Sequence, residues 1–229
     1  MPDVLNPSDE SPAAVPQESE SAAPAAAVRK RPKPGERRVQ ILQALAGMLE
    51  QPGGERITTA ALAARLAVSE AALYRHFASK AQMFEGLIEF IEQTVFSLIN
   101  QIVEREQASP AGTGDAGTRQ AVKVVAMLMQ FAEKNPGMAR VMVGDALVFE
   151  NDRLIARMNQ FFDKIESTLK QSLRDDAGAS TSATPTMDAQ VRASVLAAFV
   201  GGRLQRFVRS GYKRLPSEHL DVGLRLLLG

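Results

Sequence analysis

The 229-residue chain contains no cysteine, only two histidines, and no run of 18 or more apolar residues. The missing cysteines exclude a disulfide-stapled fold and a cysteine-based zinc or redox site. His76 and His219 are too few for a histidine-rich catalytic metal centre. The N-terminus lacks the charged-then-apolar layout of a signal peptide, and nothing is long enough for a membrane-spanning helix. We therefore expect a cytoplasmic protein that needs neither a metal nor a cofactor.

The usual signatures of catalysis are missing as well. The sequence has no Gly-rich phosphate loop, no nucleophile elbow and no HExxH motif. Glu89 and Glu92 are spaced three apart on an expected helix, and a solvated helix face is sufficient to explain them. We therefore expect a protein that is not an enzyme.

The net charge of +1 conceals an uneven distribution. Residues 1–28 hold five acids and no base, residues 29–80 hold ten bases and four acids, and residues 81–229 hold 17 of each. A basic segment beside a neutral body suggests a polyanionic partner for that segment alone. A charge run that merely solvates a surface is the alternative, and charge alone does not decide between them.

Three parts of the chain differ in composition. Residues 1–35 hold seven of the twelve prolines and few large apolar residues, so we expect a disordered tail. The tail ends in a basic arm, residues 29–34, which is either a groove-following arm or a plain linker. From Glu36 onward apolar residues recur at spacings of three and four, and no stretch alternates as a strand does. The pattern predicts an all-α protein of about nine helices, with a helix-turn-helix domain at 36–80 and a helical dimerisation and partner-binding domain at 81–229.

Local signals place most of these helices. The first begins at Glu36, and Ser79 with Gln82 matches a capping box that opens a long helix of about 25 residues. Asn135-Pro136-Gly137 ends a later helix. The remaining helices are expected at about 150–174, 187–211 and 217–228.

Residues 57–77 have the pattern of a helix-turn-helix. Thr58 or Thr59 can cap a first short helix, Ser69 can cap a second, and Ala67-Val68 joins them tightly. The second helix would then enter a major groove of DNA, with sparse base contacts and more contacts to phosphates. The residues expected to contact DNA are Thr58, Thr59, Ser69, Glu70, Ala71, Tyr74, Arg75, His76 and Lys80. Packing in the core of the domain is the alternative for Tyr74 and His76, and it is the favoured interpretation for Phe77.

These same residues carry a family resemblance. The run from Ile57 to Phe77, followed by Ser79-Lys80, resembles the DNA-binding domain of TetR-type regulators. Further runs resemble the nucleoid occlusion factor (SlmA) branch of that family, and the likeness extends over roughly residues 36–229. These runs are Met83-Phe84, Leu87-Ile88-Glu89-Phe90-Ile91-Glu92, Glu133-Lys134-Asn135-Pro136-Gly137, Ala146-Leu147-Val148-Phe149-Glu150, Asp152-Arg153-Leu154 and Arg206-Phe207-Val208-Arg209-Ser210.

The resemblance implies a function. Members of this branch are homodimers that bind palindromic chromosomal sites and, once on DNA, act on the tubulin-like division protein FtsZ, so that no division ring assembles over the nucleoid. Their FtsZ groove is lined by the fourth and fifth helices, which carries over to Phe90, Met127, Gln130, Lys134 and Asn135. The chain departs from the family in its 35-residue tail and at Leu98 and Lys134, where relatives often carry arginine. The DNA site and the number of dimers on it stay open.

Simpler interpretations exist for the partner residues. Phe90 falls off the main apolar face of its helix, which predicts an exposed ring, although single exposed apolar residues are ordinary. Lys134 and Asn135 precede Pro136-Gly137, so a role in ending the helix explains them equally well.

The expected dimer contact lies in the last two helices. Leu196, Val200 and Leu204 form one apolar stripe, and Gly201-Gly202 would permit close approach of a second copy. Packing of the same stripe within one chain is the alternative.

A ligand-responsive TetR-type repressor is the alternative function. Such a protein needs an apolar cavity with convergent polar groups between its helices. Here the expected inward faces are almost purely apolar, which favours a filled core over a small-molecule site.

Overall fold

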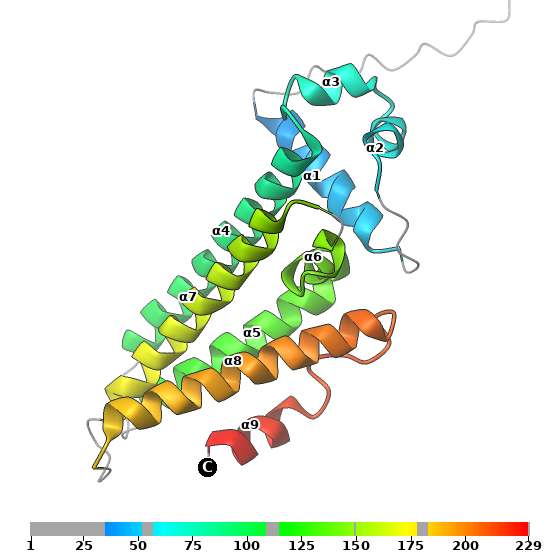
Figure 1. Cartoon of the computed structure of the whole chain (residues 1–229). Coiled ribbons are helices and arrows are strands. Elements are labelled where there is room, and N and C mark those ends of the chain that lie inside the picture. Colours follow the sequence, from blue (N-terminus) through cyan, green and yellow to red (C-terminus); the bar gives the residue numbers. More distant parts are fainter. Residues whose placement is uncertain (1–34, 52–56, 109–114, 149, 178–182, 229) are drawn as a thin grey trace, which may run out of the picture. The chain divides into compact units, whose positions relative to one another are not determined.

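A computed structural model describes residues 35–51, 57–108, 115–148, 150–177 and 183–228 (Figure 1). Within these ranges the chain forms nine α-helices and one 3-10 turn, with no strand. The predicted all-α class is therefore confirmed. The predicted tail and its basic arm lie outside the described residues.

Three helices form the N-terminal module: α1 (Glu36–Leu49), α2 (Thr59–Arg65) and α3 (Glu70–Tyr74). Leu73 and Phe77 are almost completely buried in the core, so the favoured interpretation of Phe77 as a core residue is confirmed. Ala67 turns the chain between α2 and α3 with a left-handed φ of 52°. The amide of Val68 then donates to the carbonyl of Ala63 at 3.0 Å, which closes this turn.

Helix α4 (Lys80–Gln107) links this module to the body. Ser79 caps it by accepting the Gln82 amide at 3.2 Å, and the Gln82 side chain accepts the amide of Ala78 at 2.9 Å. The capping pattern thus operates as predicted, except that its return bond goes to Ala78 instead of Ser79. At 1.5 Å per residue the 28-residue helix is about 42 Å long.

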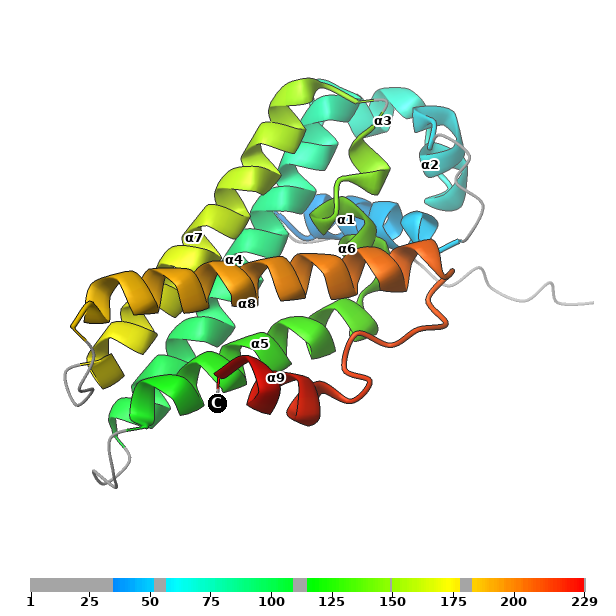
Figure 2. The same ribbon diagram turned by 60° about the horizontal axis from the view of Figure 1, so that its bottom comes forward.

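The body consists of α5 (Ala116–Lys134), α6 (Pro136–Met142), the 3-10 turn η1 (Asp145–Leu147), α7 (Asp152–Ala177), α8 (Pro185–Arg209) and α9 (Leu220–Leu228). Helices α5, α7 and α8 pack against one another, and α9 lies against α5 and α8 (Figure 2). The apolar side chains between them form one core that continues through α4 into the N-terminal module. No helix in the described part of the chain is both long enough and apolar enough to cross a membrane.

Helix α6 is the element that the sequence did not lead us to expect. Asn135 ends α5, as predicted, but Pro136 starts a new helix at once. Proline fits the first turn of a helix because its missing N–H would have no helical partner there. The residue after Pro136 must be small, because a Cβ on Gly137 would lie 2.0 Å from the carbonyl oxygen of Ala46. The backbone of α6 therefore rests directly on α1.

Candidate nucleic-acid interface

A chain of hydrogen bonds joins the start of α2 to the exposed side of α3. The hydroxyl of Tyr74 donates to the hydroxyl of Thr59 at 3.5 Å, and that hydroxyl donates to the carboxylate of Glu70 at 2.5 Å. Thr59 at the start of α2 thus lies beside Glu70 and Tyr74 of α3 at one surface. The bonds fix the relative orientation of the two helix starts and hold the Tyr74 ring, 45% exposed, at the surface.

Most of the expected DNA-contacting residues are exposed on the N-terminal module. Thr58 and Ser69 are N-caps, as predicted, because their hydroxyls accept the amides of Ala61 at 3.1 Å and Ala72 at 3.3 Å. The surface offers hydroxyls, a methyl group, a phenol and a guanidinium, which are groups that contact base edges and phosphates. The exposed members of this set are Thr58, Ser69, Glu70, Ala71, Tyr74 and Arg75, whereas Thr59 is half-buried.

His76 lies at the edge of this surface. It is half-buried, and its carbonyl accepts a 2.5 Å hydrogen bond from the guanidinium of Arg38. The same guanidinium lies over the ring of Phe77, 4.2 Å from its centroid. Arg38 therefore ties α1 to the end of α3, a role that its position in a basic run did not reveal.

Lys80 is placed differently from expectation. Its ammonium forms an ion pair with the carboxylate of Glu150, from the segment that precedes α7, and its side chain is largely covered. A neutralised ammonium attracts phosphate less than a free one. The sequence could not indicate this pairing, because the two residues are 70 positions apart.

Two more ion pairs connect α4 to α7. Arg153 lies 2.5 Å from Glu85, and Arg157 lies 2.8 Å from Glu92. The hydrogen bond that the Arg157 guanidinium donates to the Glu92 carboxylate raises the pKa of Arg157, and partial burial acts in the opposite direction. Since α4 is the helix that leaves the N-terminal module, these contacts hold the module to the body along one side.

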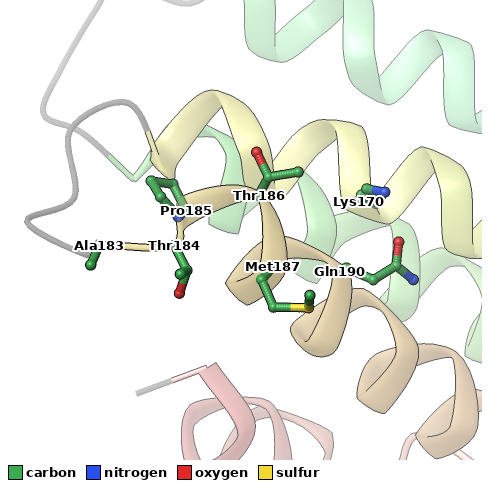
Figure 3. Close-up of a pocket in the computed structure, with 7 residues that line it drawn as sticks. All are labelled: Lys170, Ala183, Thr184, Pro185, Thr186, Met187 and Gln190. Atoms are coloured by element: carbon green, nitrogen blue, oxygen red, sulfur yellow. The ribbon is translucent and has the colours of Figure 1, made fainter.

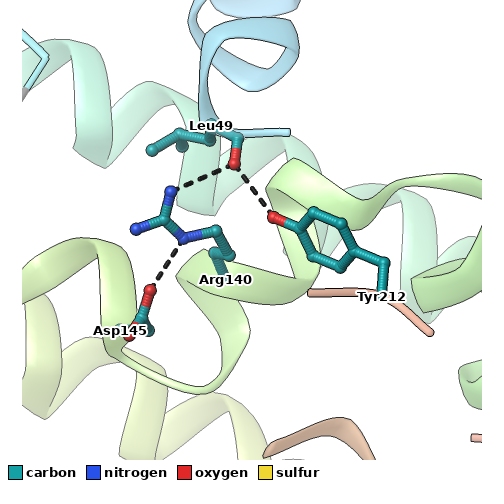
Figure 4. Close-up of polar contacts among 4 residues, drawn as sticks. All are labelled: Leu49, Arg140, Asp145 and Tyr212. Carbon is teal, nitrogen blue, oxygen red and sulfur yellow. Dashed lines mark hydrogen bonds and ion pairs between the residues drawn. The ribbon is translucent and has the colours of Figure 1, made fainter. Parts of the chain in front are cut away.

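A second polar cluster holds α1 to the body from another side (Figure 4). The carbonyl of Leu49, the last residue of α1, accepts the Tyr212 hydroxyl at 3.0 Å and the Arg140 guanidinium at 3.2 Å. Arg140 also donates to the carboxylate of Asp145 at 2.7 Å. Partial burial raises the pKa of Tyr212 above its ordinary value. Leu49 and Tyr212 are 163 positions apart, so no local pattern could have paired them.

The residues expected to contact a protein partner lie on α4 and α5, which pack together. Phe90 is half-buried and packs against the core, which corrects the expectation of an exposed ring. Met127 is also half-buried, whereas Gln130 and Lys134 are exposed. Asn135 links α5 to α6, and its side-chain amide donates to the carbonyl of Phe131 at 2.8 Å. The helix-ending interpretation of Asn135 is thereby confirmed.

The predicted dimer residues are wrong. Leu196, Val200 and Leu204 are each 0% exposed in the single chain, where they fill the core under α8. A side chain fully enclosed by its own chain has no surface left for a second copy. The spacing had correctly indicated an apolar face of α8, but this face packs inward.

The outer face of α8 carries a second apolar row. Met187, Val191 and Val195 are exposed and spaced four residues apart. Further along the same helix, a Cβ at Gly201 or Gly202 would have no atom within 4 Å. Within the described part of the chain, no neighbouring atom therefore requires glycine at these two positions.

A pocket of about 470 Å³ lies where α7 and α8 approach each other near the start of α8 (Figure 3). It is open at the surface rather than enclosed between the body helices. Its lining residues are Lys170, Ala183, Thr184, Pro185, Thr186, Met187 and Gln190.

Comparison with known proteins matches both the N-terminal module and the body to families of known regulators. Residues 41–87 match the family of bacterial regulatory proteins of the tetR type. Residues 118–228 match the SlmA-like family, described as a tetracyclin repressor-like C-terminal domain. The crystal structure of the regulator FadR from Bacillus subtilis in complex with stearoyl-CoA superimposes with a TM-score of 0.65 at 14% identity, over 83% of this chain and 97% of that one. This likeness concerns the fold alone.

Relatives of higher identity carry one name. The nucleoid occlusion factor SlmA of Idiomarina loihiensis is 50% identical over 186 residues, which are 81% of this chain and 90% of the relative. The SlmA of Alteromonas mediterranea is 49% identical over 81% of this chain and 90% of its own. The SlmA of Aliivibrio fischeri is 48% identical over 86% and 96%. The chain belongs to the SlmA nucleoid occlusion factors, within the TetR family of DNA-binding regulators.

Proposed function

We propose that the chain binds palindromic duplex DNA as a homodimer and, while bound, prevents FtsZ from assembling a division ring over the nucleoid. The observation that carries this proposal is the identity of about 50% to nucleoid occlusion factors over four fifths of the chain. This identity spans the body as well as the N-terminal module. A regulator that shared only the DNA-binding module would differ in the body.

The exposed surface of α2 and α3 is the proposed DNA-binding site. Arg75 contacts phosphate, and Ala71 lies close against base edges, where a methyl group suits thymine. The bonds among Tyr74, Thr59 and Glu70 preorganise the surface. Lys80 makes a smaller contribution, because Glu150 already neutralises it.

The outer face of α8 is the proposed dimer contact, in place of the buried stripe. The exposed row of Met187, Val191 and Val195 meets its own copy across a two-fold axis. Glycine inside a helix costs about 1 kcal/mol relative to alanine. Close approach of the second copy is a physical reason to keep glycine at 201 and 202, since the residues that the structure describes supply no steric reason.

The partner surface is proposed on α4 and α5. Phe90 presents the exposed part of its ring beside the core, and Gln130 and Lys134 are exposed on the neighbouring helix. An aromatic anchor next to a steering charge is a common arrangement for a small protein interface.

Expression in a rod-shaped bacterium tests the proposal. Excess wild-type protein should lengthen the cells and keep division rings away from nucleoids. Ala71→Trp, which changes an exposed side chain at the DNA surface, should abolish both effects at equal protein level. Normal cell length with the wild-type protein on the nucleoid would contradict the FtsZ part. Equal elongation by the variant would contradict the dependence on DNA.

A further inference from the structure

Tyr212, just after α8, has a backbone conformation that is unusual for its residue type. Its φ is 66°, and Gly211 before it has a φ of 61°. A bulky residue in the left-handed region is uncommon, so an observed case indicates a constraint at that position. The amide of Tyr212 donates to the carbonyl of Phe207 at 3.0 Å, and the two rings lie 5.2 Å apart. The conformation ends α8 and directs the phenol to α1.

The atom that Tyr212 reaches is the carbonyl at the end of the first helix of the DNA-binding module. The last carbonyls of a helix have no partner within that helix, so donors from elsewhere can fix where the helix ends. At Leu49 both donors come from the body: Arg140 from α6, and Tyr212 from the end of α8. Arg140 is itself held by Asp145, and the Gly137 backbone rests on Ala46. The end of α1 is therefore fixed by side chains that come from the body and not from α2 or α3.

We propose that Tyr212 is a positioning residue for DNA recognition, whose hydroxyl sets the orientation of the N-terminal module relative to α8. This inference rests on the proposed homodimer. Because α8 carries the proposed dimer face, the angle between α8 and α1 sets the separation of the two α3 helices across the two-fold axis. Two such helices read half-sites about 34 Å apart, one turn of duplex, so their separation determines which half-site spacing is accepted.

A positioning role makes a specific prediction for Tyr212→Phe. The ring and its contact with Phe207 stay, and only the donor to Leu49 is lost. The module then samples a wider range of orientations, because Arg140 alone holds the carbonyl. The affinity for duplexes with the wrong half-site spacing should rise relative to the affinity for the duplex with the correct spacing, while contacts to phosphate stay the same.

The test uses duplexes selected by the wild-type protein from a random-sequence library. Affinity is measured by fluorescence anisotropy for the selected palindrome, for the same duplex with one base pair inserted between half-sites, and for a scrambled duplex. Tyr212→Phe should lower the preference for correct spacing about fivefold, the effect of one net hydrogen bond. Affinity for the scrambled duplex and its salt dependence should not change.

Thr168→Val serves as the matched control. It also removes one hydroxyl-to-carbonyl bond, of 2.9 Å to Lys164, but this bond stays within α7. Its spacing preference should equal that of the wild type. Gly137→Ala adds a Cβ that would collide with Ala46, so it should shift the preferred spacing rather than broaden it.

Three results would overturn the inference. An unchanged spacing preference in Tyr212→Phe would refute the positioning role. Equal weakening on all duplexes would assign the hydroxyl to stability alone. If the wild-type protein selects no palindrome or sediments as a monomer, the proposed function fails and the inference fails with it, which the wild-type data alone reveal.

Discussion

Replacing Phe90 with alanine separates a partner-binding role from a structural one. Phe90 is half-buried on α4 and packs at the margin of the core. Truncation of a fully buried Phe costs about 3–5 kcal/mol, so a half-buried ring should cost about 2 kcal/mol. For a chain of this size that lowers the melting temperature by about 4–8 °C. The folded state should persist at 25 °C.

Phe96 offers a matched control on the same helix. It is also half-buried, and its ring meets that of Phe161 edge-to-face at 5.7 Å, so Phe96→Ala should destabilise at least as much. Phe96 lies outside the proposed partner surface. If Phe90 is an anchor worth about 2 kcal/mol, its loss raises the concentration for half-maximal FtsZ inhibition about 30-fold. Phe96→Ala should leave this concentration nearly unchanged.

Three assays on the purified variants distinguish the two roles. Melting curves give the stability, anisotropy with a selected palindrome gives the DNA affinity, and light scattering gives FtsZ inhibition. We expect Phe90→Ala to lose inhibition and keep DNA affinity. A partner-binding role for Phe90 is excluded if Phe90→Ala inhibits like the wild type, or if both variants lose inhibition in proportion to their stability.

Three further predictions concern other surfaces. Arg75→Ala should weaken binding to every duplex and lower the salt slope by about one unit, whereas Lys80→Ala should lower the slope less because Glu150 already neutralises its ammonium. Anisotropy at several salt concentrations compares the two slopes. Val195→Asp, on a side chain 41% exposed, should give a folded monomer in sedimentation, whereas Leu196→Asp, at 0% exposure, should unfold the chain in melting curves. Burial raises the pKa of Tyr212, so its protonated hydroxyl stabilises the fold at any pH below the ordinary pKa near 10, and this stabilisation is lost as the pH rises through the raised pKa. Denaturant titrations should show that loss in the wild type and not in Tyr212→Phe.

The features that the sequence predicted correctly are local ones. Ser69 and Ser79 cap helices at the expected positions, and Thr58 is the one of the two predicted candidates that caps α2. Such caps are predictable because they depend on residues two or three positions apart. The apolar spacing likewise indicated the helical class. Helix α6 was missed because its local signal is ambiguous. Pro136-Gly137 commonly ends a helix, but a proline can also begin one.

The errors at the site come from contacts between distant segments. The periodicity of α8 indicates apolar rows, but two rows exist, and Leu196 faces the core whereas Val195 faces out. Only the packing of α5 and α7 decides which row is covered. The pairing of Lys80 with Glu150 likewise depends on how the start of α7 meets α4. Such pairings are properties of the assembled fold and have no local signature.

Light scattering of polymerising FtsZ, with the chain added alone, with a scrambled duplex and with its selected palindrome, measures whether inhibition depends on specific DNA. We expect strong loss of FtsZ scattering with the palindrome, weak loss with the scrambled duplex, and the weakest loss with protein alone. Equal inhibition in all three mixtures, or none in any of them, would contradict this expectation.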